Sequence, residues 1–195
     1  EKYSRPDELL DVGCGYGFFL GEAKKRGWAV TGIEPNAEAR AYVERSTADV
    51  LPYVVGDTRL NDLPKYDCIS ALWLIEKLAD PLELVLWCYD HLFSGDVLLA
   101  VVPNDFSAIQ TQVNRIVKKK NYWIDKTHLN YFTWSSFSNL LGRCGFRIVE
   151  RTTLWPMQEY ILDGDNYVDK PELGAALHAR VRQDDLSNTQ ADRLN

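Results

Sequence analysis

The chain has 195 residues, of which 46% are apolar, so it can bury one substantial core and is too short for two ordinary domains. Lysine and arginine number 22 against 28 acidic residues, and the net charge of -6 argues against a nucleic-acid partner bound through its phosphates and favours small molecules. No segment approaches the ~18 consecutive apolar residues of a membrane span, and the start lacks a signal-peptide pattern, so we expect a soluble, cytoplasmic protein.

Apolar segments of strand length alternate with segments of helical periodicity along the whole chain. This alternation predicts a doubly wound α/β fold with a parallel sheet and helices on both faces. The strands predicted in chain order are Glu8–Val12, Trp28–Ile33, Pro52–Val55, Tyr66–Leu74, Asp96–Val102 and Phe146–Glu150. The Tyr66–Leu74 segment is nearly continuous in apolar residues, as a strand buried on both faces should be.

The first two predicted helices lie between these strands. One runs from Phe18 to Arg26 and ends at Gly27. The next is capped by Asn36 and places three apolar side chains on one face. These inward residues are Ala39, Tyr42 and Val43.

Two further helices have clear start signals. Asp80 is a capping acid followed by Pro81 and, three residues after the cap, by Glu83. The apolar residues at helical spacing after this cap are Leu82, Val85, Leu86 and Tyr89. Thr133 caps a further helix, which ends before Gly145. Its predicted inward face consists of Phe137, Leu140, Leu141 and Cys144.

The remaining segments carry weaker signals. Phe106–Asn130 is part helix and part loop, and its basic cluster of Arg115 with Lys118–Lys120 is interpreted as a solvated helix end or loop. We expect one domain over residues 1–162 and a polar tail over 163–195 that is partly helical or loosely held. The chain begins at Glu1, shortly before the first strand, which leaves room for a trimmed or omitted leading segment.

The first predicted strand carries Asp11 near its end and is followed by Gly13, Gly15 and Gly17, spaced two apart. Glycine at these positions permits a sharp strand-to-helix turn and a close approach of a ligand to the main chain. The dinucleotide fingerprint is G-x-G-x-x-G, so this spacing disfavours a nicotinamide-dependent oxidoreductase. A tight structural turn without a ligand is the alternative.

Two acids follow the next two predicted strands. Glu34 comes 21 residues after Gly13, where its carboxylate can accept hydrogen bonds from both hydroxyls of a ribose. Asp57 lies in Gly56-Asp57-Thr58, after the predicted third strand. Glu34 supports a nucleoside ligand without identifying its class.

These blocks together resemble the class I S-adenosylmethionine-dependent methyltransferases, in the group that includes ubiquinone-biosynthesis O-methyltransferases and bacterial relatives. The similarity covers roughly Leu9 to Arg151. The matching blocks, in order, are Leu9–Phe19, Gly32–Asn36, Gly56-Asp57, Tyr66–Ile69, Asp80-Pro81, Val101–Asn104, Thr127–Leu129 and Gly145-Phe146. The resemblance implies a seven-stranded, Rossmann-like sheet whose last strand is antiparallel, with S-adenosylmethionine across the carboxyl ends of the first four strands.

The resemblance also implies a role for each cofactor-binding residue. Asp11 and the three glycines are expected around the methionine portion, Glu34 at the ribose and Asp57 at the adenine amino group. Trp73 and Leu74 are candidates for an apolar wall beside the sulfonium, with a plain core role as the alternative. The full set of expected cofactor contacts is Asp11, Gly13, Cys14, Gly15, Gly17, Glu34, Pro35, Asp57, Thr58, Leu72 and Trp73.

No metal is expected. After the fourth strand, relatives often carry E-x-x-E-H or H-x-x-E-H, which binds a divalent metal in some of them. This chain has Trp73-Leu74-Ile75-Glu76-Lys77, with one carboxylate and a lysine in place of the imidazole. Glu76 and Lys77 are interpreted as a surface pair or helix-end charges. The four cysteines are widely separated and lack a C-x-x-C pair, so neither a disulfide framework nor zinc is expected.

His128 is the candidate catalytic residue. It lies in Lys126–Phe132, which resembles a family segment over the acceptor pocket, and histidine is suited to take a proton from a hydroxyl at neutral pH. A structural histidine bonded to the backbone is an equal alternative. Tyr122, Trp123 and Tyr131 are candidates to line the acceptor site, although core packing accounts for them as well.

The sequence therefore favours methyl transfer from S-adenosylmethionine to a small-molecule acceptor, with oxygen preferred as the accepting atom, by in-line displacement. The alternative is a catalytically inactive nucleoside-binding accessory or regulatory domain of the same fold. Base methyltransferases commonly carry an Asn/Asp-Pro-Pro-aromatic segment where this chain has Ala71–Leu74, so no nucleic-acid partner is expected. No membrane partner is expected either, and the protein is predicted to be a monomer or homodimer.

Overall fold

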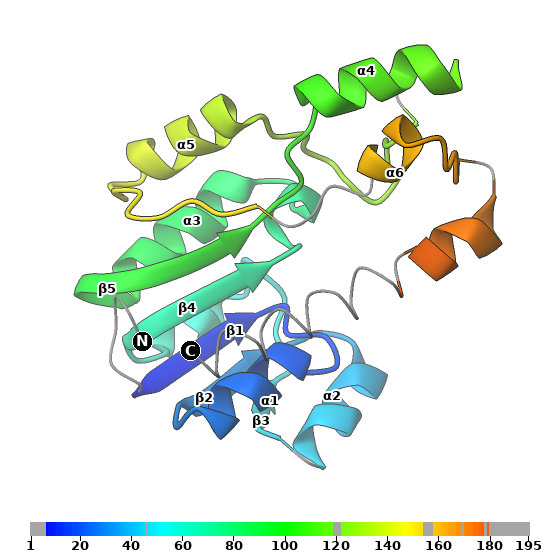
Figure 1. Cartoon of the computed structure of the whole chain (residues 1–195). Coiled ribbons are helices and arrows are strands. Elements are labelled where there is room, and N and C mark those ends of the chain that lie inside the picture. The colour runs from blue at the N-terminus through cyan, green and yellow to red at the C-terminus, as the bar shows by residue number, and fades with distance from the viewer. Residues whose placement is uncertain are drawn as a thin grey trace, which may run out of the picture. The chain divides into compact units, whose positions relative to one another are not determined.

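The computed structural model describes residues 7–45, 47–118, 122–153, 158–168, 170–177 and 179. In these residues, five strands form a single sheet of order β3-β2-β1-β4-β5, and every neighbouring pair is parallel (Figure 1). The strands are β1 (Glu8–Val12), β2 (Ala29–Ile33), β3 (Asp49–Leu51), β4 (Tyr66–Leu72) and β5 (Leu92–Val101). The α/β class is confirmed. The prediction of seven strands with an antiparallel last strand is wrong for this part of the chain.

Helices connect the strands and continue after β5. The α-helices are α1 (Phe18–Lys25), α2 (Ala37–Glu44), α3 (Pro81–Asp90), α4 (Ala108–Val117), α5 (Trp134–Arg143) and α6 (Gln158–Leu162). Two 3₁₀ helices, η1 (Thr58–Asp62) and η2 (Ile75–Lys77), follow β3 and β4. In the predicted tail, residues 171–177 are helical. No helix in the described residues is long and apolar enough to cross a membrane.

The chain forms two compact units. The first consists of Glu1–Asn104 and Lys126–Ile148, and it holds the whole sheet. The second consists of Asp105–Asp125 and Val149–Asn195, and within it α4 packs against α6. Lys119 and Lys120 of the predicted basic cluster lie outside the described residues.

The sheet of the first unit is buried on both faces, which explains why its central strands are apolar. One core includes Leu10, Ile33 and Ile69 and extends to α3 and α5. The other, which includes Leu9, Leu20 and Val43, lies among α1, α2 and the strands next to them. β1 is hydrogen-bonded on both sides, to β2 and to β4. Its carboxyl end is therefore held from two directions.

The predicted helix caps are confirmed. Asn36 Oδ1 accepts hydrogen bonds from the amides of Glu38 and Ala39. Asp80 caps α3 by accepting from two amides in the same way, with Pro81 in the first turn. Thr133 forms a reciprocal capping box with Ser136 at the start of α5. These short polar side chains satisfy amides that have no partner inside the helix, which is why the helix starts could be predicted.

Two predicted strands are wrong. The third strand lies at Asp49–Leu51, where it pairs with β2, and it ends before Pro52, which has no N–H for the ladder. Phe146–Glu150 forms no strand: the amide of Phe146 donates to the carbonyl of Leu141 and so closes α5. β4 also stops at Leu72, because Trp73 adopts a positive φ of 56°.

Two predicted helix faces also need correction. Tyr42 of α2 is half-exposed and packs edge-to-face against Tyr16, while Ala39 and Val43 are buried as expected. In α3 the buried residues are Leu84, Val85 and Cys88, whereas Leu86 and Tyr89 are exposed. α3 is apolar on more than one face, so its sequence did not determine which face meets the sheet.

Gly17 is required by both conformation and space. It precedes α1 with a φ of 71°, and a Cβ there would lie 2.8 Å from both methyl carbons of Val43. Val43 is fully buried in α2 and has little freedom to move. Gly15 has a similar φ of 54°, but a Cβ there would meet no atom within 4 Å.

We predict that Gly17→Ala lowers the free energy of unfolding by about 2–4 kcal/mol, because it combines a positive φ with overpacking against Val43. Gly15→Ala serves as the matched control and is expected to cost about 1–2 kcal/mol, from its φ alone. Urea unfolding monitored by circular dichroism measures both changes. Equal losses in the two variants would contradict the packing argument.

Candidate functional site

The candidate site lies where β1 and β2 end. Because the strands are parallel, the loops that follow them meet at one edge of the sheet. The amides of Gly13 and Cys14 both donate to the carbonyl of Ile33, the last residue of β2, at 2.7 and 3.1 Å. The loop between β1 and α1, here called the glycine loop (Gly13–Gly17), is thereby fixed across the end of β2.

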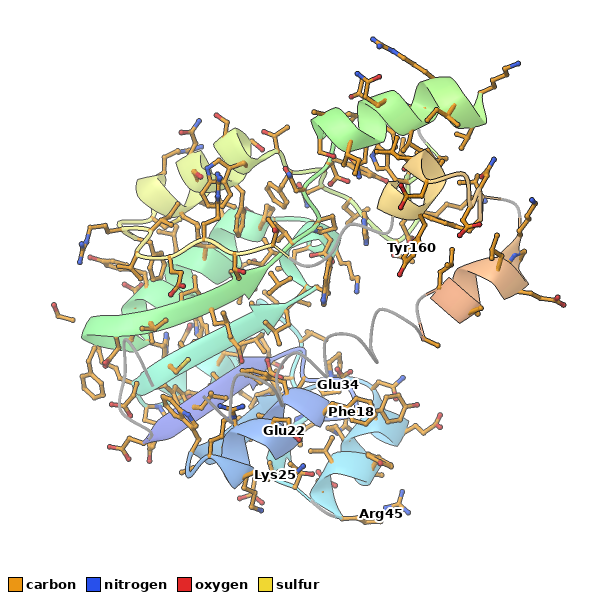
Figure 2. The ribbon with its side chains drawn as sticks, in the orientation of Figure 1. Phe18, Glu22, Lys25, Glu34, Arg45 and Tyr160 are labelled. Carbon is orange, nitrogen blue, oxygen red and sulfur yellow. The ribbon has the colours of Figure 1, made fainter. Side chains whose placement is uncertain are left out.

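The Glu34 carboxylate links the glycine loop to the start of α2. Its Oε2 accepts from the amide of Gly15 at 3.0 Å, and its Oε1 accepts from the amide of Asn36 at 2.8 Å. The backbone of Glu34 is held as well, since its amide donates to the carbonyl of Leu51 and its carbonyl accepts from Arg40. Glu34 lies at the same end of the sheet as Phe18, the first residue of α1 (Figure 2).

Pro35 is exposed in this turn, and its carbonyl accepts from Arg40 Nη1 at 2.6 Å. The structure thus joins Gly13, Cys14, Gly15, Glu34 and Pro35 around one edge, as the sequence predicted from their positions after two strands. Arg40, whose guanidinium bonds two consecutive carbonyls of the turn, was not singled out from the sequence.

Asp11 is buried near the end of β1, two residues before the glycine loop, with 2% of its surface exposed. Ser70 of β4 lies beside it in register, and Ser70 Oγ donates to Asp11 Oδ1 at 2.7 Å. Burial raises the pKa of Asp11 to about 7, and the Ser70 hydrogen bond offsets part of that shift. The sequence predicted Asp11 as a site residue but gave no signal for its partner Ser70.

The environment of Cys14 favours the protonated thiol. Burial raises the pKa of its thiol to about 12, and the nearby carboxylates of Asp11 and Glu34 act in the same direction. Its sulfur lies 2.6 Å from where a Cβ on Gly32 would be, so Cys14 packs tightly over β2.

Asp57 is paired with Arg59, for which the sequence carried no signal. Its carboxylate accepts from Arg59 Nε at 2.9 Å and from Nη2 at 2.5 Å, and it also caps η1 through the Arg59 amide. These hydrogen bonds lower the pKa of Asp57 to about 2. Arg59 lies over the Tyr53 ring at 4.3 Å, and Thr58 is exposed at the start of η1. A ligand at Asp57 would share the carboxylate with Arg59.

Trp73 turns the chain sharply at the end of β4. Its amide donates to the carbonyl of Val101, its φ is 56°, and 45% of its surface is exposed. Leu72 before it is partly buried, and the side chain of Leu74 after it lies 3.2 Å from the Cβ position of Gly13. The segment after β4 therefore contacts the glycine loop through Leu74, and the preceding residue, Trp73, is half-exposed.

Glu76 lies in the interior of the first unit and not at its surface. It is fully buried in η2, while Lys77 is exposed, so the two do not form a surface pair. Glu76 Oε1 lies 3.8 Å from Nε2 of His128, whose side chain is 16% exposed. The apolar neighbour Ile75 was the available signal that this segment turns inward. No group of three or more metal-binding side chains was found in the described residues.

The acceptor-lining candidates fall in both units. Tyr131 lies next to His128, with ring centroids 6.2 Å apart, in the first unit. Tyr122 and Trp123 contact each other in the second, where Phe106 packs edge-to-face on Trp123. Their role at an acceptor site stays a prediction.

Comparison with known proteins identifies this architecture. A family model described as a methyltransferase domain matches residues 1–151. The ubiquinone biosynthesis O-methyltransferase of Pseudomonas entomophila (strain L48) is 31% identical over 88 residues, which cover 42% of this chain and 38% of that protein. The matched segment thus spans less than two fifths of this curated relative's length.

Solved structures show the same fold. A SAM-dependent methyltransferase from Archaeoglobus fulgidus superposes with a TM-score of 0.61 at 22% identity, covering 86% of this chain and 80% of that one. The plantazolicin methyltransferase BpumL, solved in complex with SAH, gives a TM-score of 0.56 at 19% identity, covering 85% of this chain and 70% of that one. At these identities the likeness establishes the fold.

We predict that Asp11 makes stability depend on pH. Its pKa is higher in the folded protein than in the unfolded chain, so folding favours the protonated form and stability falls as pH rises from about 4 to about 7. Asp11→Asn removes the titrating carboxyl group, and the amide oxygen of the new side chain can still accept a hydrogen bond from Ser70. Relative to wild type, the free energy of unfolding of the variant should rise by on the order of 2 kcal/mol between pH 5 and pH 8. Urea titrations at both pH values measure the difference, and a constant difference would contradict it.

Proposed function

The chain belongs to the methyltransferase domain family, and from this premise we propose that it binds S-adenosylmethionine at the glycine loop and transfers the methyl group to oxygen of a small-molecule acceptor. The observation that carries the proposal is the bonding of Glu34 to the amides of Gly15 and Asn36. This bonding supports a nucleoside site, since it fixes a carboxylate beside a loop of glycine main chain.

Glu34 retains capacity for a ribose. A carboxylate oxygen has two lone pairs, and each oxygen of Glu34 uses one for a backbone amide. The second lone pair on each is available to a hydroxyl, which supports the proposed two-point contact with the sugar. Binding therefore does not require the loop to release Glu34.

The other contacts follow from the same edge of the sheet. Asp11 precedes the loop and, with the three glycines, is proposed to surround the methionine portion. A cationic donor would offset the cost of ionising the buried Asp11 carboxylate. Asp57 is proposed to meet the adenine amino group, sharing its oxygens with Arg59.

Bound S-adenosylmethionine supplies a methyl group on a positively charged sulfur that is already activated for attack. The protein contributes placement, and alignment of an acceptor with such a group can provide roughly 7–11 kcal/mol of the barrier. Trp73 and Leu74 are proposed as an apolar wall, which suits a reaction that dissipates positive charge.

Oxygen as the accepting atom is favoured by His128. A hydroxyl loses its proton as it is methylated, and His128 is proposed as the base that takes it. The similarity to proteins named as ubiquinone biosynthesis O-methyltransferases points in the same direction. The net charge of -6 favours a small molecule over nucleic acid.

We predict that wild type binds S-adenosylhomocysteine and that Glu34→Ala weakens binding by about 10- to 100-fold, the value of a charge-assisted hydrogen bond. Isothermal titration calorimetry measures both dissociation constants. Glu38→Ala is the control, because Glu38 is an exposed acid on α2, four residues from Glu34. Undiminished binding by Glu34→Ala would exclude the ribose role.

We also predict O-methylated products when the protein is incubated with S-adenosylmethionine and a panel of small phenols, carboxylic acids and amines. Mass spectrometry of the products identifies the methylated atom. His128→Gln should lower turnover by about 100-fold or more while leaving S-adenosylhomocysteine binding within about twofold, since a general base contributes at least that much. Products methylated only at nitrogen would contradict the assignment to oxygen.

A further inference from the structure

Glu76 and His128 form a pair in the first unit. Glu76 has no exposed surface, and its Oε1 lies 3.8 Å from His128 Nε2, which is ion-pair distance and longer than a hydrogen bond. The imidazole is partly exposed, so one end of the pair is accessible and the other is enclosed. Neither the sequence nor the family resemblance assigned this contact.

The backbone around the pair is tied together. The amides of Leu129 and Asn130 both donate to the carbonyl of Glu76 at 2.9 Å. The side chain of Asn130 donates to the carbonyl of Leu78 at 2.6 Å. The segment that follows His128 is therefore anchored at Glu76 and at Leu78, which keeps the backbone of His128 close to Glu76.

Burial makes the carboxylate costly unless a positive or hydrogen-donating group faces it. His128 can supply either, because its Nε2 carries a proton in the imidazolium and in one neutral tautomer. The partner of one ring nitrogen determines the tautomer and leaves the other nitrogen as the acceptor. With Nε2 facing Glu76, the accepting nitrogen is Nδ1.

We propose that Glu76 is a positioning residue for the reaction proposed above, holding His128 in the Nε2–H tautomer. The acceptor oxygen then attacks the methyl carbon, the carbon–sulfur bond breaks with its electron pair left on sulfur, and the hydroxyl proton moves to His128 Nδ1. The resulting imidazolium faces the Glu76 carboxylate, which stabilises it. The 3.8 Å contact shortens to a hydrogen bond in the reacting complex, as catalytic contacts commonly do.

A direct test is the tautomer of His128 in the wild-type chain. ¹⁵N-histidine NMR distinguishes Nε2–H from Nδ1–H in the neutral ring, and His128→Gln identifies its signals among those of the three histidines. We expect Nε2–H to be the dominant neutral tautomer of His128. A dominant Nδ1–H tautomer would overturn it, whether or not an acceptor is known and whether or not Glu76 variants fold.

Kinetics supply the second test. Glu76→Gln should lower kcat by about 10- to 100-fold with S-adenosylhomocysteine affinity within about twofold, and Glu76→Asp should recover part of the loss. In a His128→Gln background, Glu76→Gln should cause no further loss, because it acts through the imidazole. Lys77→Gln, the exposed neighbour, is the control and should match wild type.

Different results would overturn the positioning role of Glu76 and the proposed function. Turnover by wild type with equal kcat in Glu76→Gln, or additive losses in the double variant, would overturn the positioning role alone. Failure of wild type to bind S-adenosylhomocysteine would overturn the proposed function, while the NMR experiment would still decide the tautomer.

Discussion

The carbonyl of Ile33 and the carboxylate of Glu34 are the acceptors on which the candidate site depends. Together they take hydrogen bonds from three amides of the glycine loop, at Gly13, Cys14 and Gly15. These hydrogen bonds fix the turn that follows β1 against the end of β2. The parallel register between the two strands makes this possible, because it brings their carboxyl ends to the same edge.

Among the described residues of the first unit, two acidic side chains are buried. Asp11 and Glu76 are removed from solvent near the end of β1 and after β4, and a buried carboxyl generally destabilises a fold unless something compensates it. Each lies beside a polar partner that is distant in sequence, Ser70 for Asp11 and His128 for Glu76. Buried acids of this kind rarely stabilise a fold and are common at functional sites. Their presence at the carboxyl end of the sheet therefore supports a role in the proposed chemistry.

The glycine loop also shows how packing and function share residues. Gly17 is required because Val43 occupies the space where a side chain would lie, and Leu74 approaches Gly13 from the end of β4. Gly15, whose amide reaches Glu34, faces no atom at its Cβ position. The three glycines thus combine one packing requirement, at Gly17, with a close approach at Gly13 and an open position at Gly15 beside the proposed ribose carboxylate.

The sequence by itself determined the elements whose signals are local. β1 and the caps at Asn36, Asp80 and Thr133 were predicted correctly, because strand hydrophobicity and capping depend on neighbouring residues. The α/β class and the glycine loop followed from the same local patterns.

Tertiary structure decided what depends on partners distant in sequence. β3 ends before Pro52 and Phe146–Glu150 forms no strand, since a strand exists only where another strand supplies its hydrogen bonds. Arg59 bonds Asp57, and Glu76 turns inward to His128, 52 residues later in the chain. No local pattern encodes such contacts, because the free energy that favours them arises only when the sheet brings separate segments together and excludes water from between them.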